Sequence, residues 1–230
     1  MPPMNKLVRF LQEARNWLES DAFVGPLSDP PHQPDYGACA GARAVVVAID
    51  VSPSMDEPDY HPTRLEGAKR AVRRYLDTTA RYEPLTLVGV VDFHGEAQTV
   101  SHPLPNGEQY RALCHSLNRL HTGCGTNIGA GLQLAGRELA LVPSPANPTV
   151  ILLTDGDSNQ GPDPVQVAQT LKARGVQLDV IGIGGSPAEV NEEDLKRIAS
   201  ATNGQLRYWF IESADSLVER FEALALREVK

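Results

Sequence analysis

Four short apolar runs, separated by segments of helical periodicity, constrain the fold of this chain more than any other feature. The runs occupy residues 44–49 (AVVVAI), 85–93 (LTLVGVVDF), 148–155 (PTVILLTD) and 176–184 (VQLDVIGIG). Each is apolar almost throughout instead of at alternate positions, which is typical of a strand buried on both faces. Buried strands that alternate with helices indicate a mostly parallel sheet with helices on both sides.

The segments between and after the runs complete the predicted architecture. Helical spacing of apolar residues marks residues 63–82, 110–120, 127–141, 195–199 and 217–224, and a last strand is expected at 206–211. The run QTVSHPL follows the second strand after only HGEA, which is too short for a parallel crossover, so we expect an antiparallel hairpin there. The predicted fold is α/β: a Rossmann-like, doubly wound sheet of order 3-2-1-4-5-6 with one antiparallel edge strand.

The first 40 residues differ in character from the rest. Residues 4–20 place their apolar side chains on one stripe, which predicts an amphipathic helix. Residues 25–37 (GPLSDPPHQPDYG) contain four prolines and are expected to form an extended connector. We therefore divide the chain into an N-terminal helix and connector at 1–40 and a main domain at 41–230. Packing of this extra helix on the domain is the simpler expectation, and docking of a partner is the alternative.

Charge and composition exclude several classes of function. The chain has 230 residues and a net charge of −8, which argues against nucleic acid or an anionic membrane as the main partner. No apolar run approaches the roughly 18 residues of a membrane span, so we expect no membrane insertion. The first 21 residues are charged throughout and do not resemble a secretory signal. Three cysteines, an odd number, favour a reduced, cytoplasmic protein.

Two of the apolar runs end on a carboxylate, at Asp50 and at Asp155. In open α/β sheets ligands bind beyond the carboxyl ends of strands, where the strand order reverses, and this chain would place both aspartates at that point. Two unpaired carboxylates repel each other there, and a divalent cation would resolve the conflict. The spacing Asp50-x-Ser52-x-Ser54 adds two hydroxyls, and the glycine-rich loop 123–132 (GCGTNIGAGL) adds that of Thr126. Oxygen ligands of this kind suit Mg²⁺, Mn²⁺ or Ca²⁺.

Three separated motifs, DVSPSM (50–55), GTNIGAGL (125–132) and LLTDGDSN (152–159), resemble the von Willebrand factor A domain with its metal-ion-dependent adhesion site. The resemblance covers residues 41 to about 228. It implies that the hydroxyls of Ser52, Ser54 and Thr126 bind Mg²⁺ (or Mn²⁺ or Ca²⁺) directly, while Asp50 and Asp155 act through water. It also implies that the sixth ligand is a carboxylate from a partner protein. Pro53 stands where the family often has glycine, which stiffens the loop without removing a ligand.

The function expected from this resemblance is cation-dependent binding of a protein that carries an exposed Asp or Glu, without enzymatic turnover. Similarity to intracellular bacterial members implies a scaffolding role, in some families beside an AAA-type ATPase. One alternative is a Mg²⁺-dependent phosphohydrolase on the same kind of sheet. That enzyme would need a general acid two residues after Asp50, where this chain has Ser52. The other alternative is a structural subunit with a vestigial metal site.

Two further groups of polar residues receive simpler interpretations. Cys114, His115, His121 and Cys124 are metal-ligand types, but their spacing does not match that of a zinc finger. A helix face followed by a loop explains them better. Asp92 lies near the same sheet edge as Asp50 and is interpreted as a solvated residue or turn acceptor.

Overall fold

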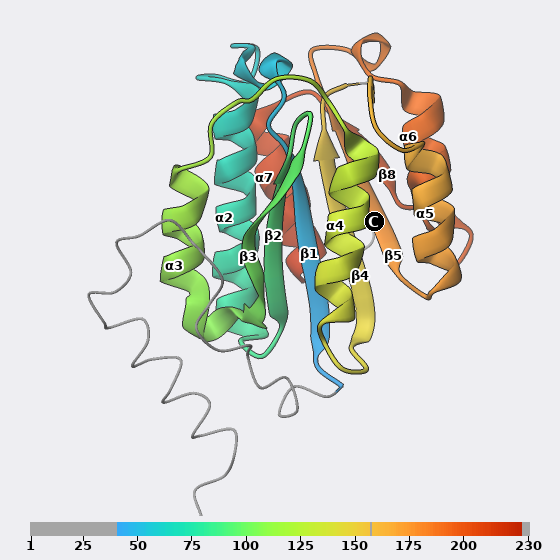
Figure 1. Cartoon of the computed structure of the whole chain (residues 1–230). Helices are drawn as coiled ribbons and strands as arrows, with labels where there is room; N and C mark the ends of the chain where they lie inside the picture. The colour runs from blue at the N-terminus through green and yellow to red at the C-terminus, as the bar shows by residue number, and fades with distance from the viewer. Residues whose placement is uncertain (1–40, 157, 227–230) are drawn as a thin grey trace, which may run out of the picture.

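The structure is a computed structural model that describes residues 41–156 and 158–226 of the chain. A six-stranded sheet of order β3-β2-β1-β4-β5-β8 forms its centre (Figure 1). All neighbours are parallel except β3, which pairs antiparallel with β2. The strands are β1 (Arg43–Asp50), β2 (Leu87–Phe93), β3 (Ala97–Pro105), β4 (Ala146–Thr154), β5 (Gln177–Ile183) and β8 (Tyr208–Ile211). The fold class predicted from the sequence, including the antiparallel edge strand, is confirmed.

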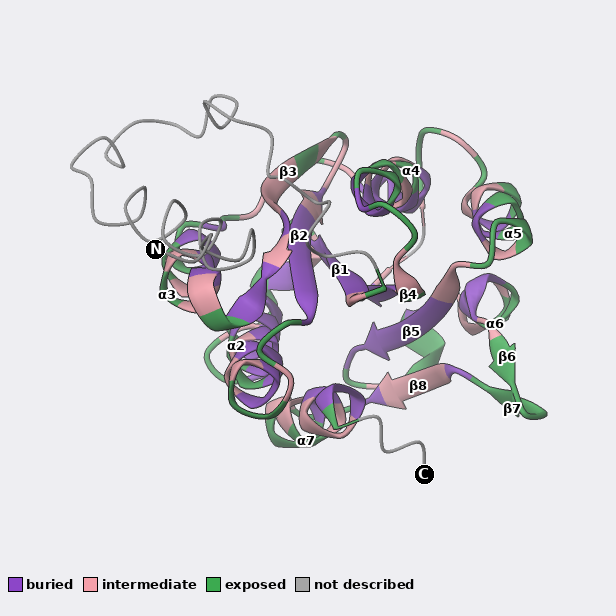
Figure 2. Ribbon diagram, turned by 90° about the horizontal axis from the view of Figure 1, so that it is seen from below, coloured by how far each residue is buried: buried purple, intermediate pink, exposed green. Residues whose placement is uncertain are grey.

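Helices cover both faces of the sheet, as Figure 2 shows from below. One face carries α2 (Arg64–Tyr82), α3 (Asn106–Asn118) and α7 (Ala214–Ala225). The other face carries α4 (Ile128–Ala140), α5 (Pro164–Ala173) and α6 (Glu192–Ile198). Two short 3-10 turns, η3 (Pro53–Asp56) and η4 (Pro187–Glu189), follow the carboxyl ends of β1 and β5.

The central strand β1 is buried on both faces. Val45, Val47 and Ile49 point toward α2, α3 and α7, and the side chains between them point toward α4, α5 and α6. All are inaccessible to solvent. Burial of one large aliphatic side chain contributes about 1.5–3 kcal/mol, so the strand is anchored firmly. The polar groups at its carboxyl end are therefore held on a rigid base.

Two parts of the chain differ from the sequence prediction. Helix α5 was not predicted, although Asp163 caps its first turn and Pro164 occupies its first position. The strand expected at 206–211 is divided, because residues 205–206 form a separate hairpin of β6 (Ala201–Thr202) and β7 (Gln205–Leu206) before β8 begins. Arg207 lies at the break, where its guanidinium binds the buried Asp179 of β5. The N-terminal helix and connector assigned to residues 1–40 lie outside the described residues.

The strand order reverses between β1 and β4, which are parallel neighbours with Ile49 opposite Leu153. Their carboxyl ends therefore lie side by side at one edge of the sheet. The loop between α3 and α4 crosses over this edge (Figure 1), and the amide of Gly123 binds the carbonyl of Val51 at 2.7 Å. Among the described helices, none is both long and apolar enough to cross a membrane.

Candidate metal-ion site

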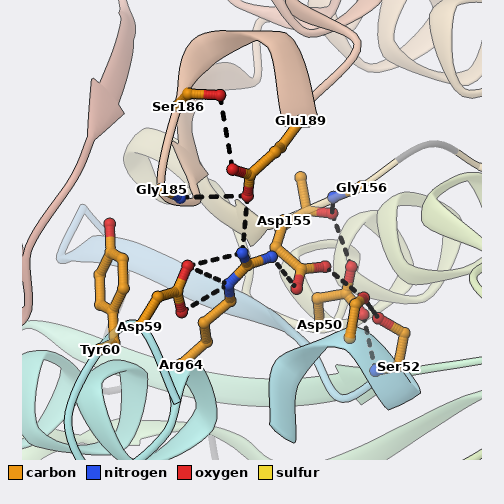
Figure 3. A network of polar contacts seen from close by, with 12 residues as sticks. Asp50, Ser52, Asp59, Tyr60, Arg64, Asp155, Gly156, Gly185, Ser186 and Glu189 are labelled. Carbon is orange, nitrogen blue, oxygen red and sulfur yellow. Dashed lines mark hydrogen bonds and ion pairs between the residues drawn. The ribbon is translucent and has the colours of Figure 1, made fainter. Parts of the chain in front are cut away.

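Four of the five residues predicted to form a metal site are joined by hydrogen bonds at the end of β1 and β4 (Figure 3). The backbone N–H of Ser52 donates to Oδ1 of Asp50 at 2.8 Å. The Ser52 and Ser54 hydroxyl oxygens lie 3.1 Å apart. The Ser54 hydroxyl donates to Oδ1 of Asp155 at 2.8 Å, which links the loop after β1 to the end of β4. Two carboxylates and two hydroxyls thus form one continuous cluster.

Asp50 is completely buried, and both of its carboxylate oxygens are engaged. Oδ1 accepts from the Ser52 amide, and Oδ2 accepts from the Thr154 hydroxyl at 2.6 Å. Burial, and then the charge of Asp155, raise the pKa of Asp50 to about 7, although its hydrogen bonds to Thr154 and Ser52 act in the opposite direction. This carboxylate therefore fixes the turn that presents Ser52, and a nearby cation would favour its ionised form.

The two carboxylate oxygens of Asp155 accept hydrogen bonds from different groups, a hydroxyl and a guanidinium. Its Oδ1 accepts from Ser54, and its Oδ2 accepts from Nη1 of Arg64 at 3.1 Å. Burial raises the pKa of Asp155, while the bonds from Ser54 and Arg64 lower it. Arg64 thus neutralises part of the negative charge of the cluster.

Arg64 was not identified from the sequence. It is the first residue of α2, its exposed fraction is 7%, and it contacts two further carboxylates. Nε donates to Asp59 at 2.9 and 3.0 Å, and Nη2 donates to Asp59 at 2.6 Å and to Glu189 at 2.7 Å. The hydrogen bond to Asp59 makes the largest contribution to a raised pKa of Arg64, so its charge is permanent. The sequence shows only that this arginine begins a helix. Its three partners, Asp59, Asp155 and Glu189, are far apart from one another in the chain, so no local pattern reveals them.

The fifth predicted residue, Thr126, is held by its backbone to Asn159 in the loop that follows β4. Its N–H donates to Oδ1 of Asn159 at 3.2 Å, and its carbonyl accepts from the N–H of Asn159 at 3.0 Å. The residue is buried, at 7% exposure. Within the described residues, no hydrogen bond joins the Thr126 hydroxyl to Asp50, Ser52, Ser54 or Asp155.

Glycines allow the loop that carries Thr126 to lie close to its neighbours. Gly125 has a φ of +78°, a conformation that favours glycine. A Cβ atom at Gly129 would lie 2.1 Å from the carbonyl oxygen of Pro162. The glycines of the motif therefore serve the approach of two backbone segments at this edge.

Asp92 differs from its sequence interpretation. It lies inside β2, and its Oδ1 is buried without a hydrogen-bond partner among the described residues. Burial raises its pKa, although His94 and His121 lower it. In the described part of the chain, no three His, Cys, Asp or Glu side chains gather so that they could hold a metal ion by themselves. A metal site at the end of β1 therefore needs the serine and threonine hydroxyls as ligands.

A surface depression of about 790 Å³ opens at the cluster. It is lined by Ser54, Glu57, Pro58, Asp59, Arg64, Asp155, Gly156, Gly185 and Glu189. Carboxylate and hydroxyl oxygens are the donors that hard divalent cations prefer, so the residues present fit such an ion. A ligand that enters the depression reaches Ser54 and Asp155 from the solvent side.

Residues 44–223 match the family model of the von Willebrand factor type A domain. The chain belongs to this family. The von Willebrand factor type A domain thus accounts for the sheet, for both helical layers and for the three sequence motifs. The resemblance inferred from the motifs is confirmed at the level of the family.

Relatives of this von Willebrand factor type A domain include a UPF0353 protein of Mycolicibacterium paratuberculosis. The two are 30% identical over 231 aligned positions, which cover 90% of this chain and 65% of the relative. The chain therefore spans less than two thirds of that relative. The match therefore does not assign the function of the longer protein to this chain.

Solved structures agree with the fold. A von Willebrand factor type A protein of Catenulispora acidiphila is 30% identical with a TM-score of 0.70, over 82% of this chain and 43% of that chain. Proximal thread matrix protein 1 of the mussel byssus is described with zinc in its MIDAS motif. It is 24% identical with a TM-score of 0.64, over 81% of this chain and 48% of that chain, and this likeness shows the fold alone.

Proposed function

We propose that this domain is a divalent-cation-dependent protein-binding module. In this proposal Asp50, Ser52, Ser54, Thr126 and Asp155 form a metal-ion-dependent adhesion site, and an Asp or Glu of a partner protein completes the coordination of the ion. The observation that carries the proposal is the buried, hydrogen-bonded cluster of two carboxylates and two hydroxyls beside an open depression. Burial, and then the charge of Asp155, raise the pKa of Asp50 to about 7, and a bound cation would offset both effects.

The protein groups have separate roles in this proposal. The Ser52 and Ser54 hydroxyls face each other and supply neutral ligand oxygens, and Asp50 holds the Ser52 backbone in place. Asp155 orients the Ser54 hydroxyl. A cation that is bound mainly by neutral oxygens keeps its affinity for an external anion, and a partner carboxylate supplies it.

Mg²⁺ and Mn²⁺ are the ions that we propose first, with Ca²⁺ as a third candidate. All three prefer oxygen ligands, and Mg²⁺ tolerates a site that leaves several waters in place. Zinc is included in the test because one structural neighbour is described with zinc in its MIDAS motif.

Hydrolysis of phosphoesters is the alternative that this structure supports less well. The position two residues after Asp50 holds Ser52, so the general acid expected in such an enzyme is missing. Arg64 is already bound by Asp59, Asp155 and Glu189. A phosphate would have to displace one of these carboxylates, and the general acid is still missing, so we propose that the domain has no turnover of its own.

Calorimetric titration with Mg²⁺, Mn²⁺ and Zn²⁺ tests the metal site. The wild type should bind, and Ser52→Ala/Ser54→Ala should not, although it should keep the fold because no core strand is changed. Thr170→Ala is the matched control, since it removes an exposed hydroxyl from α5. Equal binding by all three proteins would contradict the proposed site.

Capture of partner proteins tests the binding module. Protein retained by the wild type in Mg²⁺ should be released by EDTA and should not be retained by the double serine variant. EDTA-insensitive retention would contradict the cation-dependent mechanism. Metal-dependent hydrolysis of p-nitrophenyl phosphate that disappears in Asp50→Asn would favour the enzyme instead.

A further inference from the structure

Glu189 ends η4 and lines the depression beside the candidate metal site, and its side chain points toward Arg64 (Figure 3). Its Oε2 accepts from Nη2 of Arg64 at 2.7 Å and from the N–H of Gly185 at 3.1 Å. Its Oε1 accepts from the hydroxyl of Ser186 at 3.4 Å. Three hydrogen-bond donors thus converge on one carboxylate, and together they form a carboxylate-binding site.

The three carboxylates bound to Arg64 differ in how firmly they are held. The Asp155 side chain is 0% exposed, and that of Asp59 is 30% exposed and receives bonds from both Nε and Nη2. The Glu189 side chain is 43% exposed and receives one bond from Arg64. Because a half-exposed ion pair contributes little to stability, Glu189 is the partner of Arg64 that another carboxylate can replace.

Arg64 and the cluster of metal-site residues face the same depression. Its lining includes Ser54 and Asp155 as well as Arg64 and Glu189. The guanidinium donates to Asp155 through Nη1 and to Glu189 through Nη2, so it links Glu189 to the cluster. A carboxylate that approaches an ion at Ser54 therefore meets the guanidinium as a second positive group.

We propose that Arg64 determines specificity by binding the acidic residue of the partner as a second anchor, and that Glu189 holds the place of that residue in the free protein. This inference rests on the proposed function. It commits to a carboxylate as the ligand, because the donors around Glu189 are an arginine, an amide and a hydroxyl. Arginine binds a carboxylate through a planar fork that lysine does not reproduce.

Glu189 then acts as an internal competitor. Binding of a partner carboxylate replaces the Arg64–Glu189 ion pair with a similar one, so the number of charge-assisted bonds is kept. Neutral side chains gain nothing from the exchange and leave Arg64 with Glu189. The ion and Arg64 together would thus select an acidic residue over an amide of the same shape.

Acetate labelled with ¹³C in the carboxylate is the probe, and Mn²⁺ is the metal. Bound Mn²⁺ increases the ¹³C relaxation rate of any acetate that reaches it, even when binding is weak. The electron paramagnetic resonance signal measures free Mn²⁺, and the difference from total Mn²⁺ gives the occupancy of the site. Labelled acetamide is the neutral control. At equal Mn²⁺ occupancy, Glu189→Gln should raise the acetate relaxation by about two- to fivefold, the effect expected from loss of a half-exposed ion pair.

Two variants separate the role of Arg64 from a general change of charge. Glu57→Gln removes the same charge from the lining of the depression, and no bond joins the Glu57 carboxylate to Arg64 among the described residues, so acetate relaxation should change little. Adding Arg64→Lys to Glu189→Gln should abolish the gain, while circular dichroism confirms that the variant is folded.

The outcomes distinguish this inference from the proposed function. If Mn²⁺ binds but Glu189→Gln behaves like Glu57→Gln, the role of Arg64 and Glu189 is wrong and the metal site stands. If the gain survives Arg64→Lys, or if acetamide gives the same gain, the anchor is not Arg64. If Mn²⁺ does not bind the wild type, the proposed function itself fails.

Discussion

The Thr154 hydroxyl donates a 2.6 Å hydrogen bond to Oδ2 of Asp50, and both residues are completely buried. Asp50 ends β1 and Thr154 ends β4, so the bond joins the two strands at the edge that carries the candidate site. Together with the Ser52 amide on Oδ1, it holds the Asp50 carboxylate in one orientation. It also opposes the burial and the charge of Asp155 that raise the pKa of Asp50 to about 7.

The metal-free protein should lose stability as the pH rises toward neutrality. The pKa of Asp50 is about 7 in the folded protein and 3.8 ordinarily, so the folded state binds the proton more tightly. This stabilisation is complete below about pH 4 and is lost as the pH rises through about 7. Asp155, whose pKa burial also raises, acts in the same direction. Urea unfolding in EDTA should show the decrease between about pH 4 and pH 7.

Asp59 and Arg64 do not reverse this trend. Arg64 lowers the pKa of Asp59, so that group titrates below the window, and Arg64 stays charged throughout. The variant Asp50→Asn should flatten the decrease, and Mg²⁺ should oppose it in the wild type, because the positive charge of the ion favours the ionised carboxylates. A decrease of equal slope in Asp50→Asn would show that another group is responsible.

Thr154→Val should weaken metal binding at neutral pH without breaking the fold. Valine has the shape of threonine but cannot donate to Asp50, so the pKa of Asp50 rises further and its ionised form is scarcer. A hydrogen bond to a charged group contributes about 1.5–3 kcal/mol, so a loss of roughly tenfold in Mn²⁺ affinity is expected. Calorimetry measures it, and Thr154→Ser is the control that keeps the hydroxyl. Equal affinity of the valine and serine variants would contradict the role of this bond.

The buried ion pair between Asp179 and Arg207 should support the fold and leave the metal site alone. Their side chains are 3% and 7% exposed, and Nη2 of Arg207 donates to Oδ2 of Asp179 at 2.7 Å. Asp179→Ala leaves the guanidinium buried without its carboxylate, which should cost about 3–5 kcal/mol in the free energy of unfolding. Chemical denaturation measures the loss. A Mn²⁺ affinity that falls in parallel, in protein shown to be folded, would contradict the separation of the two sites.

Gly129→Ala should destabilise the domain more than Gly136→Ala in the same helix. At Gly129 the new Cβ would lie 2.1 Å from the carbonyl oxygen of Pro162, so one backbone segment must move. At Gly136 it would lie 2.4 Å from Cδ2 of Leu171, the end of a flexible side chain. Overpacking against the backbone costs about 1–3 kcal/mol, whereas the Leu171 side chain can move aside, and helix propensity favours alanine at both positions. Thermal melts compare them, and equal melting temperatures would contradict this prediction.

Much of the fold was determined by the sequence alone, because local patterns specify it. The apolar run before Asp50 predicts a strand buried on both faces, and β1 is such a strand. The short connection at HGEA excludes a parallel crossover, and β3 is antiparallel. Helix α5 also has local signals in the sequence, because Asp163 caps its first turn and Pro164 occupies its first position.

The grouping of Asp50, Ser52, Ser54 and Asp155 could also be predicted. Strands of a parallel sheet end at one edge, so residues that follow two such strands meet there whatever their separation in the chain. The division of the last strand at Arg207 could not be predicted, because the buried partner of that arginine, Asp179, lies on another strand.

Only the tertiary structure revealed Arg64 and Glu189 as parts of the same site. Asp59, Asp155 and Glu189 come from three different loops, and their contacts with one guanidinium depend on how α2, β4 and η4 are placed around it. No spacing along the chain encodes that placement. The periodicity of apolar residues is a local property, so it can be read from the sequence. The partner of a buried charge depends instead on how distant segments pack. A buried charge must be paired, and its partner is the opposite charge that the fold brings within hydrogen-bond distance.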